Sequence, residues 1–262
     1  MFQNETLKKL KKNWIQNITI LLIHCFAVFS LINWNESIIL LVFLVYIRVF
    51  FVAAGIHRYF SHKAFKLNRF WQFIFAIAGT LCLQNSLFWW AERHRQHHKS
   101  SDTPLDPHNR AEGALWSHIL WIMADTKPVD VKKIPDIAKF PELRFLDTHY
   151  QLINGIFALV LLFSFGPHFF AWGYCLATVI SWHLNFVVNS LCHKFGYRTF
   201  NGNNQSRNIW VLSFLTLGEG LHNNHHAQSY SPNNRVKKYE VDLTYVILWV
   251  LSKLMIVEFK RE

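Results

Sequence analysis

Four apolar runs constrain this chain more than any other feature of its sequence. A helix that crosses a lipid bilayer needs about 20 mostly apolar residues, and the runs approach that length. Only a few residues separate the runs within each of two pairs, and Gly166 and Pro167 divide the second pair. We therefore expect an all-α integral membrane protein with two helical hairpins, whose four spans cover residues 14–33, 37–55, 151–165 and 168–188.

The basic residues predict which side of the membrane each loop occupies. The chain has 27 Lys and Arg residues against 16 Asp and Glu residues, yet neither hairpin turn contains a basic residue. Because basic loops stay in the cytoplasm, we expect both termini and a helical cap of residues 56–150 and 189–262 on that side. Residues 1–262 then form a single membrane domain. Such apolar runs are not expected in a nucleic-acid-binding protein of similar charge, so no nucleic-acid partner is predicted.

Two copies of the pattern His-x-x-His-His stand out among the histidines: "HRQHH" at residues 94–98 and "HNNHH" at residues 222–226. Positions i, i+3 and i+4 share one face of a helix, so the three histidines of each copy should converge on one point beside their helix. Neutral imidazole is the commonest protein ligand for transition metals. Six imidazoles exceed the four ligands of a structural zinc site, so the patterns predict a larger metal centre.

Three further histidines lie on the predicted cytoplasmic side. His57 and His62 are about 140° apart around an ideal helix, so they either face different metals or lie on the two sides of a helix end. His193 follows the fourth predicted span. Nine imidazoles suit two ions with four or five ligands each, and zinc, copper, nickel and iron all accept imidazole. The remaining histidines are expected to be structural: His24, His108, His118, His149, His168 and His183.

Taken in order, the histidine-containing segments resemble those of the membrane-bound fatty acid desaturases, in particular the acyl-CoA desaturases of the stearoyl-CoA (delta-9) type. The segments are "GIHRYFSHKAFK", "WWAERHRQHHKSSDTPLDPHN", "NSLCHKFGYR" and "NQSRN…GEGLHNNHH". With the four-span layout, the resemblance covers most of the chain. It implies an oxygen-dependent enzyme that introduces a cis double bond into a saturated acyl chain. It also implies electrons from a separate donor protein, such as a ferredoxin or a cytochrome b5.

The resemblance further implies that two ferrous ions (Fe²⁺) form the metal centre, with O₂ as co-substrate. Asn189 would reach one iron through a water molecule. Gln84, Asn85 and Trp90 match positions that line the substrate path in the animal enzymes. The implied ligand set is His57, His62, His94, His97, His98, Asn189, His193, His222, His225 and His226.

Three carboxylates are candidates for orienting the histidines. A metal-binding histidine usually donates its other ring N–H to a carboxylate or a carbonyl group. Glu219 lies three residues before His222, on the same helical face, and Asp102 and Asp106 follow the second histidine segment closely. Each could equally be a solvated carboxylate or a helix cap.

The chain departs from the family pattern at positions that help to hold coenzyme A in the animal enzymes. Glu92-Arg93 replaces the family's Arg-Asp, and Asp125-Thr126 replaces an Arg-Lys pair, with only Lys127 beside it. The acyl carrier therefore stays open between acyl-CoA, acyl-lipid and another thioester.

A second departure concerns the substrate tunnel. Asn185-Phe186 stands where the family has Thr-Trp, which predicts a different bend in the tunnel.

Two other functions are compatible with the same histidines. A hydroxylase would use the same iron chemistry and leave a hydroxy acid. A metal transporter would bind its ion within the spans, near the middle of the membrane. Because the nine histidines lie beyond the predicted inner ends of the spans, the desaturase interpretation is favoured.

Overall fold

The computed structural model describes residues 10, 12–32 and 36–260, and most of them are helical, as the sequence predicts. The exception to an all-α fold is one short antiparallel ribbon, in which Lys66 lies opposite Glu258. The strands are β1 (Phe65–Leu67) and β2 (Val257–Phe259). The longer helices are α2 (Trp14–Ser30), α3 (Ile38–Phe50), the π-helix η1 (Phe51–Ser61), α4 (Arg69–Thr80), α5 (Leu87–Ser100), α8 (Pro141–Thr148), α9 (Tyr150–Phe169), the π-helix η5 (Phe170–Leu176), α10 (Ala177–Leu191) and α13 (Leu243–Lys253). The shorter helices are η2 (Arg110–Glu112), the π-helix η3 (Trp116–Leu120), α6 (Trp121–Ala124), η4 (Val131–Lys133), α7 (Pro135–Ala138), α11 (Trp210–Leu215) and α12 (His222–Ala227).

The predicted apolar runs all become helices, with shifted ends. Helix α3 continues directly into η1, so the second run forms a helix of 24 residues, Ile38–Ser61. Among the described residues, this helix and the stretch Tyr150–Leu191 are long and apolar enough to cross a membrane, whereas Trp14–Ser30 is apolar but shorter. The first hairpin turn falls on residues 33–35, outside the described part of the chain.

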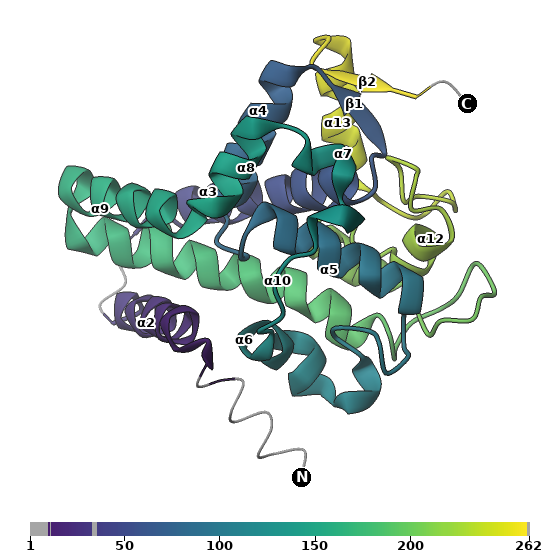
Figure 1. Ribbon diagram of the computed structural model, residues 1–262, viewed down its shortest axis with the longest axis horizontal. Coiled ribbons are helices and arrows are strands. Elements are labelled where there is room, and N and C mark those ends of the chain that lie inside the picture. The colour runs from purple at the N-terminus through teal and green to yellow at the C-terminus, as the bar shows by residue number, and fades with distance from the viewer. Residues whose placement is uncertain (1–9, 11, 33–35, 261–262) are drawn as a thin grey trace.

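The second hairpin turns where the sequence predicts. Gly166 has φ +82° and ψ +168°, a conformation that a residue with a side chain rarely adopts, and Pro167 cannot continue the preceding helix without losing a hydrogen bond. The chain therefore reverses, and α9 lies alongside the η5–α10 helix that follows it (Figure 1).

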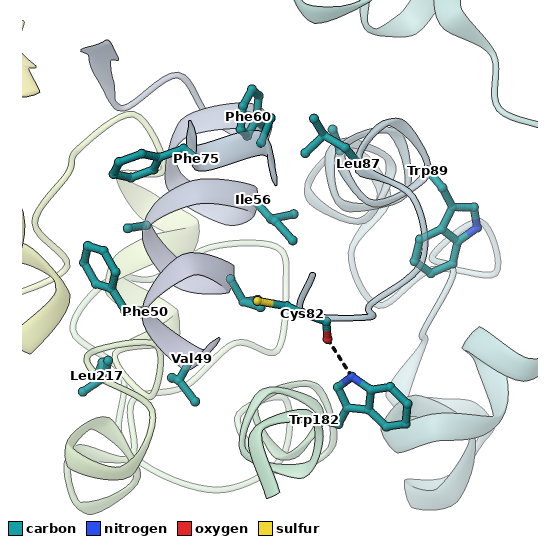
Figure 2. Close-up of a cluster of buried hydrophobic side chains, with 14 of the residues drawn as sticks. Val49, Phe50, Ile56, Phe60, Phe75, Cys82, Leu87, Trp89, Trp182 and Leu217 are labelled. Atoms are coloured by element: carbon teal, nitrogen blue, oxygen red, sulfur yellow. Dashed lines mark hydrogen bonds between the residues drawn. The ribbon is translucent and has the colours of Figure 1, made fainter. Parts of the chain in front are cut away.

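The apolar core surrounds η1. Side chains from α4, α5 and α10 pack around this π-helix, with Phe60, Phe75 and Leu87 almost fully buried (Figure 2). The indole N–H of Trp182 in α10 donates a 3.0 Å hydrogen bond to the carbonyl oxygen of Cys82 (Figure 2). This core holds the C-terminal end of η1 against α5, and the first five histidines of the site lie on these two elements or directly after η1.

Candidate metal centre

The nine predicted histidines form two adjacent clusters. In each cluster one ring nitrogen per residue lies within 4.8 Å of all the others. The two clusters touch where the rings of His98 and His226 stack, with centroids 4.3 Å apart. One cluster contains His57, His62, His94, His98 and His225, and the other contains His97, His193, His222 and His226.

Each His-x-x-His-His pattern is divided between the two clusters, so the expectation that it converges on one point is wrong. On α5, His94 and His98 belong to the five-histidine cluster, while His97 faces the four-histidine cluster. Helix α12 does the reverse, because His222 and His226 share one cluster and His225 crosses to the other. Around the axis of an α-helix, residue i+4 lies about 40° from residue i in one direction, whereas residue i+3 lies about 60° from it in the other direction. Each helix therefore borders both clusters.

A π-helix explains how His57 and His62 reach the same cluster. The backbone N–H of His62 donates to the carbonyl oxygen of His57, five residues earlier, at 3.2 Å. This wider turn brings the two rings to a centroid distance of 5.0 Å. His62 is also the first residue after η1 ends. Of the two sequence-based alternatives, the helix end is therefore correct, and the placement at different metals is wrong.

Carboxylates contact three of the histidines through Nδ1. The Nδ1 of His97 lies 2.9 Å from Asp106 Oδ1, and that of His193 lies 3.0 Å from Asp102 Oδ1. Glu219 contacts His57, not its sequence neighbour His222, because α12 begins only at His222 and Glu219 lies before the helix. The three predicted carboxylates thus all touch histidines, with the partner of Glu219 different from the sequence expectation.

Burial and hydrogen bonding set the protonation of these carboxylates. Burial raises the pKa of Asp106 to about 6, despite hydrogen bonds from the backbone N–H groups of Asp102 and His108. Burial also opposes ionisation of Asp102, but hydrogen bonds from His193 and Gln205 leave its pKa lowered. Burial also opposes ionisation of Glu219, but its contacts with His57 and with the guanidinium of Arg58 lower its pKa to about 2.

Burial and the neighbouring imidazoles keep most of these histidines neutral. Burial, followed by the proximity of the other imidazoles, lowers the pKa well below 6.5 for each of the following residues: His94, His97, His98, His222, His225 and His226. A neutral imidazole keeps one nitrogen lone pair, which is the form that binds a metal.

The proton positions in the four-histidine cluster show that it suits a cation. When the Nδ1–H groups of His97 and His193 point to carboxylates, their Nε2 lone pairs face inward. Those Nε2 atoms lie 3.1 Å from the Nε2 of His226 and 3.0 Å from that of His222, respectively, and the latter two are 3.0 Å apart. At most two Nε2 protons, on His222 and His226, can serve these three contacts, so at least one contact places two lone pairs or two N–H groups against each other. A bound metal ion removes that repulsion.

A small cavity of about 50 Å³ opens beside the clusters. The rings of His57, His94 and His222 line it, together with Gln84, Trp90 and Asn189, three of the four residues that the resemblance assigns to the substrate or to a water ligand. The ring of Trp90 stacks on His94 with centroids 4.7 Å apart. Its indole N–H donates to Gln84 Oε1 at 3.3 Å. The amide nitrogen of Gln84 is buried and has no hydrogen-bond partner among the described residues.

An apolar cavity of about 420 Å³ adjoins the small one. The two share Gln84, Ile122 and Phe186, and Asn85 lines only the larger cavity. This volume lies in the range of small-molecule binding sites. Asn185, at the position of the predicted bend, lines the small cavity and donates to the carbonyl oxygen of Ser181 at 2.8 Å.

Sequence reasoning missed two residues next to the clusters. Arg58 donates to both Glu219 and Asp242 and is almost fully buried. The ring of His108 lies tilted against that of His97, with centroids 4.1 Å apart, and His108 could form a third group with His97 and Asp106. Because the Nδ1 of His97 already contacts Asp106, Asp106 and His108 lie outside the four-histidine cluster, on the far side of the His97 ring from its Nε2. The sequence indicates these two residues only by position, because Arg58 directly follows His57 and His108 lies two residues after Asp106.

The other histidines lie outside the clusters, as expected. His183 contacts His24 through Nε2 at 3.2 Å and His118 through Nδ1 at 2.8 Å, so these three form a separate chain. His149, directly after α8, donates through Nδ1 to the carbonyl oxygen of Phe145 at 2.9 Å, and His168 contacts Glu36.

Comparison with known sequences agrees with this geometry. A profile of the fatty acid desaturase family matches residues 33–244, and the chain belongs to that family. The chain is 40% identical over 205 residues to an sn-1 stearoyl-lipid 9-desaturase of Synechocystis sp., covering 78% of this chain and 64% of that protein, less than two thirds of its length. An sn-1 stearoyl-lipid 9-desaturase of Anabaena variabilis is 35% identical over 92% of this chain and 90% of its own length. An acyl-CoA C20 Delta5-desaturase of Anemone leveillei is 34% identical over 88% of this chain and 75% of its own length.

Proposed function

We propose that this protein is an oxygen-dependent fatty acyl desaturase that places a cis double bond in a saturated acyl chain at a di-iron centre. The observation that carries this proposal is the pair of imidazole clusters that border a small cavity adjoining an apolar one. The apolar cavity suits an acyl chain, and the clusters provide nitrogen ligands for two ions. Family membership favours iron among the metals that accept imidazole.

The bound irons would supply the activation of O₂ for removal of two hydrogens, and the protein would supply positioning. Glu219, Asp102 and Asp106 fix the rings of His57, His193 and His97 by accepting their Nδ1–H groups. Trp90 and Gln84 lie between the clusters and the apolar cavity, where they would hold one methylene pair of the chain beside the metals. Fixed positioning of this kind can account for a large share of a rate enhancement and would select the bond that reacts. Asn189 lines the same cavity, in a position suited to hold a water molecule.

We also propose that the protein spans the membrane four times and that residues 1–262 form one domain with the histidines on the cytoplasmic side. Large apolar side chains on α3 and α9 support this placement. Ile39 is 80% exposed and Phe163 is 83% exposed, a cost in water that a bilayer removes. The electrons would come from a separate ferredoxin or cytochrome b5.

The test is expression in a host that lacks unsaturated fatty acids, followed by chromatography of the fatty acid methyl esters. We expect a new cis-olefin only in the presence of oxygen, and none from the variant His97→Ala. A hydroxy acid in its place would favour the hydroxylase, and metal uptake by vesicles without any lipid change would favour the transporter. No new product from iron-loaded protein would contradict the proposal.

A further inference from the structure

Three of the nine cluster histidines are partly exposed, and their rings form a row that we call the imidazole row. The ring centroids of His62 and His98 are 4.4 Å apart, and those of His98 and His226 are 4.3 Å apart. The other six histidines are buried. His62 and His98 belong to the five-histidine cluster and His226 belongs to the four-histidine cluster. The imidazole row therefore brings the surface of the protein next to both clusters at once.

The imidazole row lies on the side of the protein that the proposed topology places in the cytoplasm. His62 directly follows η1, His98 lies in the last turn of α5, and His226 lies in α12. Figure 1 shows α12 and the C-terminal end of α5 at the opposite end of the molecule from the turn between α9 and η5. A soluble protein can therefore reach the row without entering the bilayer.

Positive charge predominates beside the imidazole row. Two exposed lysines, Lys63 and Lys99, each directly follow a histidine of the row. Arg95 lies beside Lys63, because both contact the carboxylate of Asp136, at 2.8 and 3.1 Å respectively. Lys99 forms no ion pair with any residue that the structure describes. Three cations thus stand against the one carboxylate that they contact, and such a surface attracts an acidic partner.

We propose that the imidazole row is the docking surface at which an acidic one-electron carrier protein delivers electrons to the metal centre. This inference rests on the proposed desaturase function. Removal of two hydrogens from the acyl chain, with reduction of O₂ to two water molecules, takes up two further electrons and two protons. Two reduced carriers supply these electrons in successive dockings, and each carrier is oxidised by one electron. Because the row borders both clusters, one docking position serves the whole centre.

A second path of ring contacts leads to the clusters, but it begins at buried residues. The ring centroid of His108 lies 4.1 Å from that of His97 and 4.9 Å from that of Trp121, which lines a separate polar cavity. His108 and Trp121 are both buried, so a carrier on that side stays two rings away from His97. Electron transfer slows steeply with distance. The imidazole row needs no intermediate ring, because its own members belong to the clusters.

The test is reduction of the oxidised, iron-loaded protein in the absence of O₂ and lipid substrate, which makes the readout independent of turnover. Reduced ferredoxin and reduced cytochrome b5 are mixed with the protein separately, and oxidation of the carrier is followed by its absorbance. Lys99→Glu reverses the unpaired charge beside His98. We expect it to slow reduction by the faster carrier about tenfold at ~10 mM salt and less than about twofold at ~1 M salt, where charges are screened.

Two further variants keep this test decisive. Ala227→Glu places a negative charge at an exposed residue directly after His226, so it should slow reduction in the same salt-dependent way if Lys99→Glu loses iron. Lys12→Glu is the matched control. Lys12 is exposed and precedes Asn13, whose side chain contacts Met123 in α6, away from the imidazole row, so its carrier rates should not change.

The possible outcomes separate this inference from the proposed function. Equal slowing in Lys99→Glu and Lys12→Glu, no slowing in Lys99→Glu or Ala227→Glu, or reduction by neither carrier would overturn the docking surface. Salt-dependent reduction that Lys99→Glu slows, combined with no new olefin in the expression host, would instead contradict the desaturase function and leave the docking surface supported.

Discussion

Replacing Asp106 by Asn should weaken metal binding at the four-histidine cluster alone. Asp106 Oδ1 faces His97 Nδ1 at 2.9 Å and also accepts the backbone N–H of His108 at 3.1 Å. Its other oxygen, Oδ2, accepts the backbone N–H of Asp102 at 2.9 Å. An amide has the same shape but only one oxygen. If that oxygen stays toward His97 and His108, the amide NH₂ faces the backbone N–H of Asp102; if it turns to Asp102, the NH₂ faces His97 Nδ1 and the backbone N–H of His108. In either orientation a charged acceptor becomes neutral and donors face one another.

The consequence is a weaker hold on the Nδ1–H tautomer of His97. With Nδ1 accepting from the amide, the ring proton moves to Nε2, the atom that faces the cluster. Loss of a carboxylate that orients a ligand typically costs 10- to 100-fold in metal affinity, which corresponds to about 1.4–2.8 kcal/mol. His57, in the other cluster, has Glu219 as its partner and is unaffected.

Titration with a chelator, followed by metal analysis of the protein, measures this effect. We expect Asp106→Asn to lose one of its two ions at a chelator concentration 10- to 100-fold lower than the unaltered protein, and to keep the other. Asp136→Asn is the matched control, because Asp136 holds α5 through Arg95 and contacts no cluster histidine. Retention of both ions by Asp106→Asn, or loss of both together, would refute the reasoning.

Three further predictions concern other parts of the site. Glu219→Gln removes one of the two buried carboxylates paired with Arg58, which keeps Asp242, so it should lower the free energy of unfolding by about 1.5–3 kcal/mol; an unchanged midpoint of thermal unfolding in detergent would contradict this. Gly155→Trp should fill part of the apolar cavity and shorten the longest acyl chain that is desaturated, whereas Ile156→Trp, whose side chain is exposed outside the cavity, should not; lipid profiling distinguishes the two. Removal of metal should lower the unfolding temperature, because an ion that binds only the folded chain stabilises it; equal unfolding temperatures with and without metal would show that the clusters bind no ion.

The composition of the candidate centre could be predicted from sequence, but its division into two clusters could not. The spacing in "HRQHH" places His94, His97 and His98 on nearby parts of one helix face, which is correct. Whether His97 joins His94 or faces away depends on what packs against α5, and that is decided by the position of α12. Tertiary contacts hold this information, and helical periodicity does not.

Local backbone geometry limited the sequence analysis in the same way. A spacing of five residues predicts divergent rings for His57 and His62 on an α-helix, and only the π-helical hydrogen bond brings them together. If α12 began before Glu219, the three-residue spacing would place Glu219 beside His222. The chain is not helical before His222, and the carboxylate of Glu219 contacts His57. The hairpin at Gly166 was predictable because glycine followed by proline acts through backbone geometry alone.

The most direct test of the central claim is the iron content of the purified protein after expression in iron-supplemented medium. Two clusters of four and five imidazoles predict two iron ions per chain. The double variant His97→Ala with His222→Ala, which removes two of the four ligands from one cluster, should retain one ion. A folded, unaltered chain that binds no iron, or a double variant that still binds two ions, would contradict the account.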